Sequence, residues 1–153
     1  MVACKDKEEV NRLYNALIHG GQELMPLDTY PFSPWYAWIE DRYGLSWQIM
    51  LTENYEATPR IRPSLLFAKE ALGKAQDFMN DMLLLFNSSK KGEISYYQPG
   101  ESEITDAKVK YGELILEGFP LVVMDHGKGG DFTFNEAFSF IIHCNNQNEI
   151  DYY

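Results

Sequence analysis

The stretch "DRYGLSWQIM", residues 41–50, predicts a tight turn followed by a strand that closes a folding unit. Gly44 suits the turn because glycine adopts positive φ without steric cost. Along the strand, side chains alternate between the two faces of a sheet, so Ser46, Gln48 and Met50 share one face. The closing strand comes early, with roughly two thirds of the chain still to follow. We therefore expect further units after it.

The residues before this stretch complete a unit over residues 1–52. Apolar residues recur at helical spacing in residues 5–19, Asp6 and Glu9 form a pattern resembling a capping box, and Gly20 follows the helix. A short strand precedes the helix, and three strands follow it, the last of which is the closing strand. The predicted order is strand, helix and three strands.

The same order starts again after a polar linker at residues 53–59. Residues 60–126 read as a strand, a helix over residues 69–86 and three more strands. Residues 127–153 then contain a loop, a strand at 137–144 and the opening of a helix. The terminal segments "MVACKDKEEVNRLY" and "IIHCNNQNEIDYY" line up, with cysteine and glutamate at matching positions. We interpret this match as a structural repeat.

Composition and charge exclude several classes of function. The chain has 153 residues, a formal net charge of −10 and a pI near 4.7. This balance disfavours nucleic acid and anionic membranes, which need clustered Lys and Arg. We find no signal peptide and no apolar run of bilayer length. The two cysteines suit a reducing compartment, so we expect a cytoplasmic protein without a disulfide framework.

Three stretches resemble the PhnB-like family of the vicinal-oxygen-chelate superfamily, which includes glyoxalases, bleomycin-resistance proteins and dioxygenases. Members of the PhnB-like group commonly carry the name demethylubiquinone methyltransferase. The resemblance rests on "CKDKEEVNRLYNALIHGG", "WIEDRYGLSWQI" and "FTFNEAFSFIIHCNNQNEIDYY". It implies an α+β fold of paired βαβββ modules, whose curved mixed sheets form a cup.

In this chain the family order is changed. Residues 1–52 resemble the second half of a typical member, and residues 60–126 more weakly resemble the first half. One interpretation is a piece of a tandem protein, and another is a permuted or decayed version. Because either arrangement leaves sheet edges unpaired, we expect a homodimer that exchanges strand 137–144.

The resemblance also directs attention to ligand-binding positions. Superfamily enzymes hold a divalent metal with His, Glu or Gln residues inside the cup, and the position four residues after the turn glycine is Gln48. An amide is a poorer ligand for a hard cation than a carboxylate, and Val122, at the matching position of residues 60–126, cannot ligate a metal. We expect no metal and no cofactor. The candidates for a ligand pocket are Gln48, Ser46, Met50, Trp38, Asp125 and Ser139.

Three functions remain open on the sequence. The first is a PhnB-like protein that binds a small apolar or aromatic molecule without an intact metal site. The second is a metal-dependent enzyme of the glyoxalase or dioxygenase type, with Gln48 as one ligand. The third is a structural or oligomerising module without a ligand site. Fold resemblance by itself does not choose among them.

Overall fold

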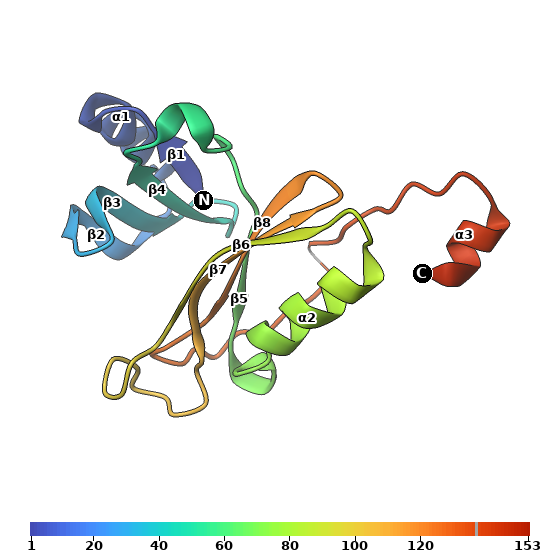
Figure 1. Ribbon diagram of the computed structural model, residues 1–153. Helices are drawn as coiled ribbons and strands as arrows, with labels where there is room; N and C mark the ends of the chain where they lie inside the picture. The colour runs from blue at the N-terminus through green and yellow to red at the C-terminus, as the bar shows by residue number, and fades with distance from the viewer. Residues whose placement is uncertain (137) are drawn as a thin grey trace. The chain divides into compact units, whose positions relative to one another are not determined.

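The computed structural model describes residues 1–136 and 138–153. They divide into two compact units, Met1–Pro63 and Ser64–Tyr153. Figure 1 shows the course of the chain through both units. Among the described residues, none of the helices has the length and apolar character needed to cross a bilayer.

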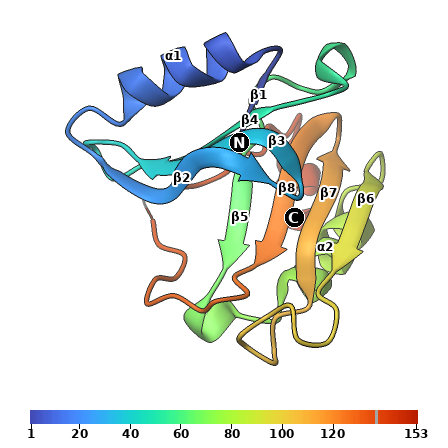
Figure 2. The same ribbon diagram turned by 90° about the vertical axis from the view of Figure 1, so that its left-hand side faces the viewer.

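Unit 1 contains a four-stranded sheet covered on one face by a helix (Figure 2). We call this sheet A; its strand order is β1-β4-β3-β2, with β1 parallel to β4 and the other pairs antiparallel. Its elements are β1 (Val2–Cys4), α1 (Lys7–Leu17), β2 (Gln22–Tyr30), β3 (Ser33–Glu40) and β4 (Ser46–Leu51). The predicted strand, helix and three strands are therefore present.

Helix α1 begins where the sequence predicts. The Asp6 carboxylate accepts the backbone N–H of Glu9 at 2.8 Å, and Glu9 in turn accepts the backbone N–H of Lys5 at 3.1 Å. This reciprocal capping satisfies two N–H groups near the helix end that no helical carbonyl reaches. Behind the cap, Val10 is fully buried against a core that includes Ile39 and Ile49.

The turn at residues 41–45 is organised by one side chain. The Asp41 carboxylate accepts the backbone N–H groups of Tyr43 at 2.9 Å and Leu45 at 3.0 Å, while Gly44 takes a φ of +83°. Its second oxygen accepts the indole N–H of Trp47 at 2.8 Å. This last bond is the main reason why the pKa of Asp41 lies below its usual value. The turn thus fixes the start of β4.

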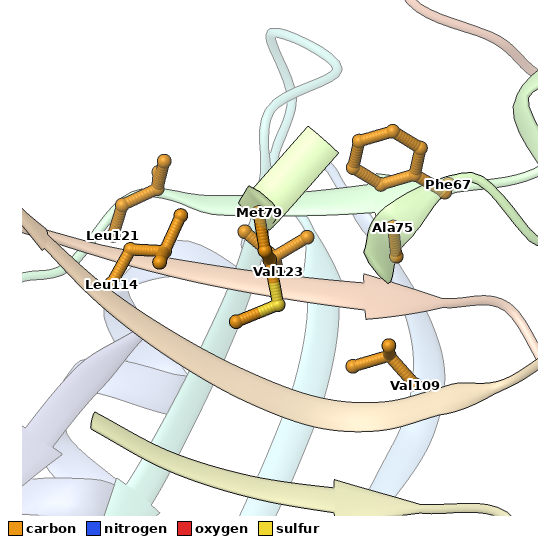
Figure 3. Packing of buried hydrophobic residues seen from close by; sticks show 7 residues of the cluster. All are labelled: Phe67, Ala75, Met79, Val109, Leu114, Leu121 and Val123. Atoms are coloured by element: carbon orange, nitrogen blue, oxygen red, sulfur yellow. The ribbon is translucent and has the colours of Figure 1, made fainter. Parts of the chain in front are cut away.

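Unit 2 repeats this architecture. Its sheet, sheet B, has the order β5-β8-β7-β6, with β5 parallel to β8. The elements are β5 (Ser64–Phe67), α2 (Ala75–Leu85), β6 (Lys90–Tyr96), β7 (Val109–Leu116) and β8 (Phe119–Asp125). The buried cluster between α2 and the sheet is drawn in Figure 3; its members are Phe67, Ala75, Met79, Val109, Leu114, Leu121 and Val123. The predicted α+β fold with two βαβββ units is confirmed.

Two expected boundaries differ from the structure. The helix predicted over residues 69–86 is divided into a 3-10 turn, Lys69–Ala71, and α2, because Gly73 between them has a φ of +80°. A positive φ is incompatible with a continuous right-handed helix. In the linker predicted at residues 53–59, Tyr55–Ala57 forms a second 3-10 turn.

Residues 60–62 were predicted to begin the first strand of unit 2. In the structure they belong to unit 1 and pair with residues 1–3. Ala3 donates its backbone N–H to the Arg60 carbonyl at 2.9 Å, and Arg62 donates to the Met1 carbonyl at 3.0 Å. An antiparallel bridge joins Val2 and Ile61 between them. The outer edge of β1 is therefore covered by these residues, and β5 begins only after Pro63, which lacks an N–H for a ladder.

The strand predicted at residues 137–144 is not formed by its described residues, 138–144, which belong to no strand or helix. Residue 137 itself lies outside the described residues. A strand exists only through pairing with a neighbour, and these residues have none among the strand pairs of the single chain. The expected helix opening does form, as α3 (Gln147–Tyr152).

Candidate functional site

The face of sheet A opposite α1 gathers four of the six candidate residues. The antiparallel register places Trp38 beside Gln48 and Tyr36 beside Met50. Because directly opposed residues share a face and alternate residues repeat it, Ser46 lies on this face as well. We call the group Tyr36, Trp38, Ser46, Gln48 and Met50 the helix-free site.

The centre of the helix-free site is a hydrogen bond between two side chains. The Tyr36 hydroxyl donates to Oε1 of Gln48 at 3.1 Å. Tyr36 is only 3% exposed, and this burial raises the pKa of its hydroxyl far above the ordinary value. Tyr36 is therefore a neutral hydrogen-bond donor at physiological pH. The Gln48 amide oxygen is engaged by this donor, which leaves the amide N–H groups as the part of Gln48 able to serve a ligand.

A second side-chain hydrogen bond runs diagonally across the same strands. The indole N–H of Trp38 donates to the Ser46 hydroxyl at 2.6 Å. This bond orients the indole ring on the sheet beside Gln48, its register partner. The half-buried Met50 adds a flexible, polarizable side chain to the same face. The arrangement presents apolar surface with a few polar groups held in place by hydrogen bonds.

Three aromatic rings gather at the β2–β3 turn. Tyr30 stacks on Phe32 with centroids 5.5 Å apart, and each of these rings meets Tyr36 edge to face, at 5.4 and 5.0 Å. Such edge-to-face pairs are favourable because ring edges and faces carry opposite partial charge. The cluster holds the Tyr36 ring in place and extends the apolar surface next to Gln48.

The other two tryptophans pack on the helix side of sheet A. Trp47 packs against the α1 core, and its indole N–H donates to Asp41. Trp35 donates its indole N–H to the Asn11 side chain at 2.8 Å, and the Lys7 ammonium lies 4.2 Å from the Trp35 ring centroid. Of the three tryptophans, Trp38 alone belongs to the helix-free site.

Asp125 has a different role from the one predicted. Its carboxylate lies on the helix side of sheet B, buried to 1% exposure. One oxygen accepts backbone N–H groups from Gly73 and Ala75, and the other accepts them from Lys108 and Val109, at distances from 2.9 to 3.4 Å. Both oxygens are used in joining α2 to β7. Asp125 therefore stabilises the unit and is not a ligand-facing group.

The last candidate, Ser139, lies exposed in the C-terminal segment and outside any strand. It is not among the residues that form the helix-free site.

The corresponding face of sheet B has other chemistry. Val122 is fully buried and lies between Ser64 on β5 and Glu113 on β7. The Tyr111 hydroxyl donates to the Glu113 carboxylate at 2.5 Å. The Ser64 hydroxyl oxygen is buried, and the described residues give it no hydrogen-bond partner. This face carries a carboxylate on β7, where the sequence reasoning did not look for one.

No metal-binding cluster of three or more His, Cys, Asp or Glu side chains occurs within residues 1–136 and 138–153. Gln48 is the position where the family resemblance places a metal ligand, and its neighbours on the helix-free site are a phenol, an indole, a hydroxyl and a thioether. This donor set lacks the carboxylates that hard cations prefer. The residues present do not fit a resident divalent metal at Gln48.

Sequence reasoning missed two features of these faces. Tyr36 stands out in the sequence as an aromatic residue in excess of what a strand needs, but its bond to Gln48 depends on the β3–β4 register. That register follows from the turn at residues 41–45, so the signal was available. Glu113 and Tyr111 lie two residues apart on one strand, and their spacing also indicated a shared face.

Two βαβββ units with mixed four-stranded sheets define a protein of the glyoxalase-like α+β class. The family described as 3-demethylubiquinone-9 3-methyltransferase matches residues 1–50 and 59–153, which is most of the chain. The protein therefore belongs to this PhnB-like family. The break in the match overlaps the residues expected to form a linker.

Solved structures that are similar to the chain include the following two. One is a PhnB protein from Bacillus cereus described as a 3-demethylubiquinone-9 3-methyltransferase; it is 29% identical with a TM-score of 0.53, over 61% of this chain and 68% of that one. The other is a protein from Staphylococcus aureus, 39% identical with a TM-score of 0.32, over 33% of this chain and 44% of that one. No curated protein matches the sequence.

Proposed function

We propose that the protein binds a small, uncharged aromatic or apolar molecule on the helix-free site, without a metal held by Gln48. The observation that carries this proposal is the hydrogen bond from the buried Tyr36 hydroxyl to the Gln48 amide oxygen. It commits that oxygen to a protein donor and turns the amide N–H groups into the groups that would meet a ligand. A ligand with a carbonyl oxygen and a flat ring matches this arrangement.

The family description supports a quinone as the molecule with which to test binding. It names demethylubiquinone, a molecule with a ring that carries carbonyl oxygens. A ring of this kind would lie against Trp38 and accept a hydrogen bond from Gln48. The net charge of −10 also favours an uncharged ligand over an anionic one.

The three tryptophans provide an internal control for a test by NMR. A short-chain ubiquinone is titrated into the ¹⁵N-labelled protein, and indole resonances are assigned with Trp-to-Phe variants. We expect the Trp38 indole and the Gln48 side-chain amide to shift with saturation. The Trp35 and Trp47 indoles are bonded on the helix side and are expected to stay in place.

Two further measurements complete the test. Gln48→Leu is expected to weaken binding about tenfold, the effect of losing one hydrogen bond to a carbonyl. Equal shifts at all three indoles, or no saturable shift at all, would contradict the proposal. Stoichiometric binding of Mn²⁺ that broadens the Gln48 amide selectively would instead support the metal-dependent enzyme.

A further inference from the structure

The hydroxyl hydrogen of Ser46 is left for a ligand by the bond that Ser46 makes to Trp38. An indole nitrogen is a donor only, so in this 2.6 Å bond the Ser46 oxygen is the acceptor. The hydroxyl hydrogen of Ser46 is not used in this bond, and within the described part of the chain no acceptor is found for it. Ser46 therefore presents a hydrogen-bond donor on the helix-free site.

The amide of Gln48 is oriented in a similar way by Tyr36. Tyr36 is only 3% exposed, and Oε1 of Gln48 is the acceptor that the described residues offer to its hydroxyl hydrogen. If the amide were turned over, this buried hydrogen would lose its partner, which is costly in a protein interior. The amide nitrogen of Gln48, with its two hydrogens, is therefore the part that is left for a ligand.

Ser46 and Gln48 together form a pair of donors on one strand. They are two residues apart on β4 and share a face, so their Cα atoms are about 7 Å apart. A ring that carries an oxygen at each end can accept from both. The Ser46 and Gln48 oxygens each already accept one hydrogen bond from the protein, so an incoming O–H would have to share them. The sulfur of Met50 is a weak acceptor. The helix-free site thus favours acceptors over donors.

We propose that the helix-free site selects the oxidised form of its ligand, a ring with carbonyl oxygens, over the same ring with hydroxyl groups. The preference rests on the proposed function, because it requires that the ring lies on this face. Reduction of a quinone by two electrons and two protons turns both carbonyl oxygens into hydroxyls, and each new hydrogen needs an acceptor. The proposal concerns binding alone and assigns no electron transfer to the protein.

Within this proposal the side chains have two different roles. Ser46 and Gln48 determine specificity through the donors that they present, and Trp38 and Tyr36 are positioning residues that orient those donors. The net charge of −10 acts in the same direction, because it disfavours the anion that a quinol forms when it loses a proton.

Separate titrations with the two forms of one ring test the preference. A short-chain ubiquinone, and its quinol kept reduced under anaerobic conditions, are each added to the ¹⁵N-labelled protein and followed at the Trp38 indole. We expect the quinone to have a dissociation constant about tenfold lower than that of the quinol, which corresponds to about one hydrogen bond.

The variant Gln48→Glu should invert the order of the two forms. A carboxylate of nearly the same shape still accepts from Tyr36, but it has no N–H for a carbonyl and it accepts readily from a quinol hydroxyl. A chelator in the buffer keeps metal ions from the new carboxylate. A merely structural role for Gln48 would weaken both forms alike and would not invert them.

Tyr36→Phe tests the orienting bond by itself. Without the phenol, the Gln48 amide can turn either its oxygen or its nitrogen toward the ligand, so the ratio of the two dissociation constants should fall from about ten toward one. The matched control is Tyr14→Phe, which removes a phenol that donates to Glu23 at 2.7 Å. Tyr14 packs on the helix side of sheet A, and its variant should keep the tenfold ratio.

The outcomes separate this proposal from the function on which it rests. Equal dissociation constants for quinone and quinol, with a saturable Trp38 shift for each, would overturn the selection and leave the proposed function standing. A preference for the quinone that survives both Tyr36→Phe and Gln48→Glu would also overturn it, because stacking of the ring would then be the cause. No saturable shift with either form would overturn both.

Discussion

The two units build the same βαβββ fold but start their helices in different ways. Helix α1 is capped by its own preceding residue, Asp6, which is three positions from the N–H that it accepts. Helix α2 has Lys74 at its cap position and no side-chain cap of its own. Asp125, about fifty residues later at the end of β8, supplies the carboxylate for Gly73 and Ala75. The same physical need is met locally in one unit and across the fold in the other.

This difference has consequences for stability. A local cap stabilises one helix end, and a helix can fray there without disturbing the sheet. Asp125 also accepts the N–H groups of Lys108 and Val109, so it joins three parts of unit 2 in one buried group. A carboxylate that is buried and fully hydrogen-bonded is costly to remove, because its donors are left without partners. Unit 2 therefore depends on a single side chain more than unit 1 does.

Replacing Asp125 should have the largest effect. We expect Asp125→Ala to lower the free energy of unfolding of unit 2 by about 4 kcal/mol, because four backbone N–H groups lose their acceptor and those of Ala75 and Val109 are buried. The matched change Asp6→Ala in unit 1 should cost about 1 kcal/mol, the usual value for a lost helix cap. Urea unfolding gives the two energies, and amide exchange at Gly73, Ala75, Lys108 and Val109 locates the loss. Equal costs for the two variants would remove the distinction between the units.

Close backbone approaches offer a second contrast between the units. A Cβ on Gly21 would lie 2.0 Å from the carbonyl oxygen of Glu40, whereas a Cβ on Gly112 would lie 2.9 Å from the Met79 side-chain tip. A backbone carbonyl in a sheet cannot move away, but the end of a methionine side chain can rotate. We expect Gly21→Ala to cost about 3 kcal/mol and Gly112→Ala about 1 kcal/mol. Thermal unfolding followed by circular dichroism gives the ranking, and a larger loss for Gly112→Ala would reverse it.

How much of this could be predicted from the sequence depends on the distance over which each feature acts. The α1 cap and its glycine end follow from patterns within a few residues, and both were predicted. The α2 start was placed too early, because the glycine break and its carboxylate partner are far apart in the chain. The role of Asp125 was missed for the same reason.

The candidate site shows the same limit. Alternation along β4 was enough to place Ser46, Gln48 and Met50 on one face. The bond that gives Gln48 its chemistry comes from Tyr36 on another strand, and it requires the register of β3 against β4. The strand predicted at residues 137–144 is a different case. A strand needs a paired neighbour, and residues 138–144 pair with none of the strands among the described residues of the chain.

The smallest expected effect concerns acid stability of the local cap. The N–H of Lys5 and then the Arg60 guanidinium hold the pKa of Glu9 below its ordinary value of 4.5. Because the folded state binds this proton less tightly than the unfolded state, Glu9 stabilises unit 1 above about pH 4.5 and loses this effect as the pH falls through its lower, folded pKa. Glu9→Gln should cost about 0.5 kcal/mol near neutral pH, since Arg60 is partly exposed.

The same variant should show a flatter fall in stability under acid. Urea unfolding of wild type and Glu9→Gln at several pH values gives the two curves, which should converge below the folded pKa of Glu9. Curves that stay parallel throughout the acid range would mean that the carboxylate charge of Glu9 does not stabilise the cap. In that case the local cap of α1 would consist of the Asp6 side chain alone.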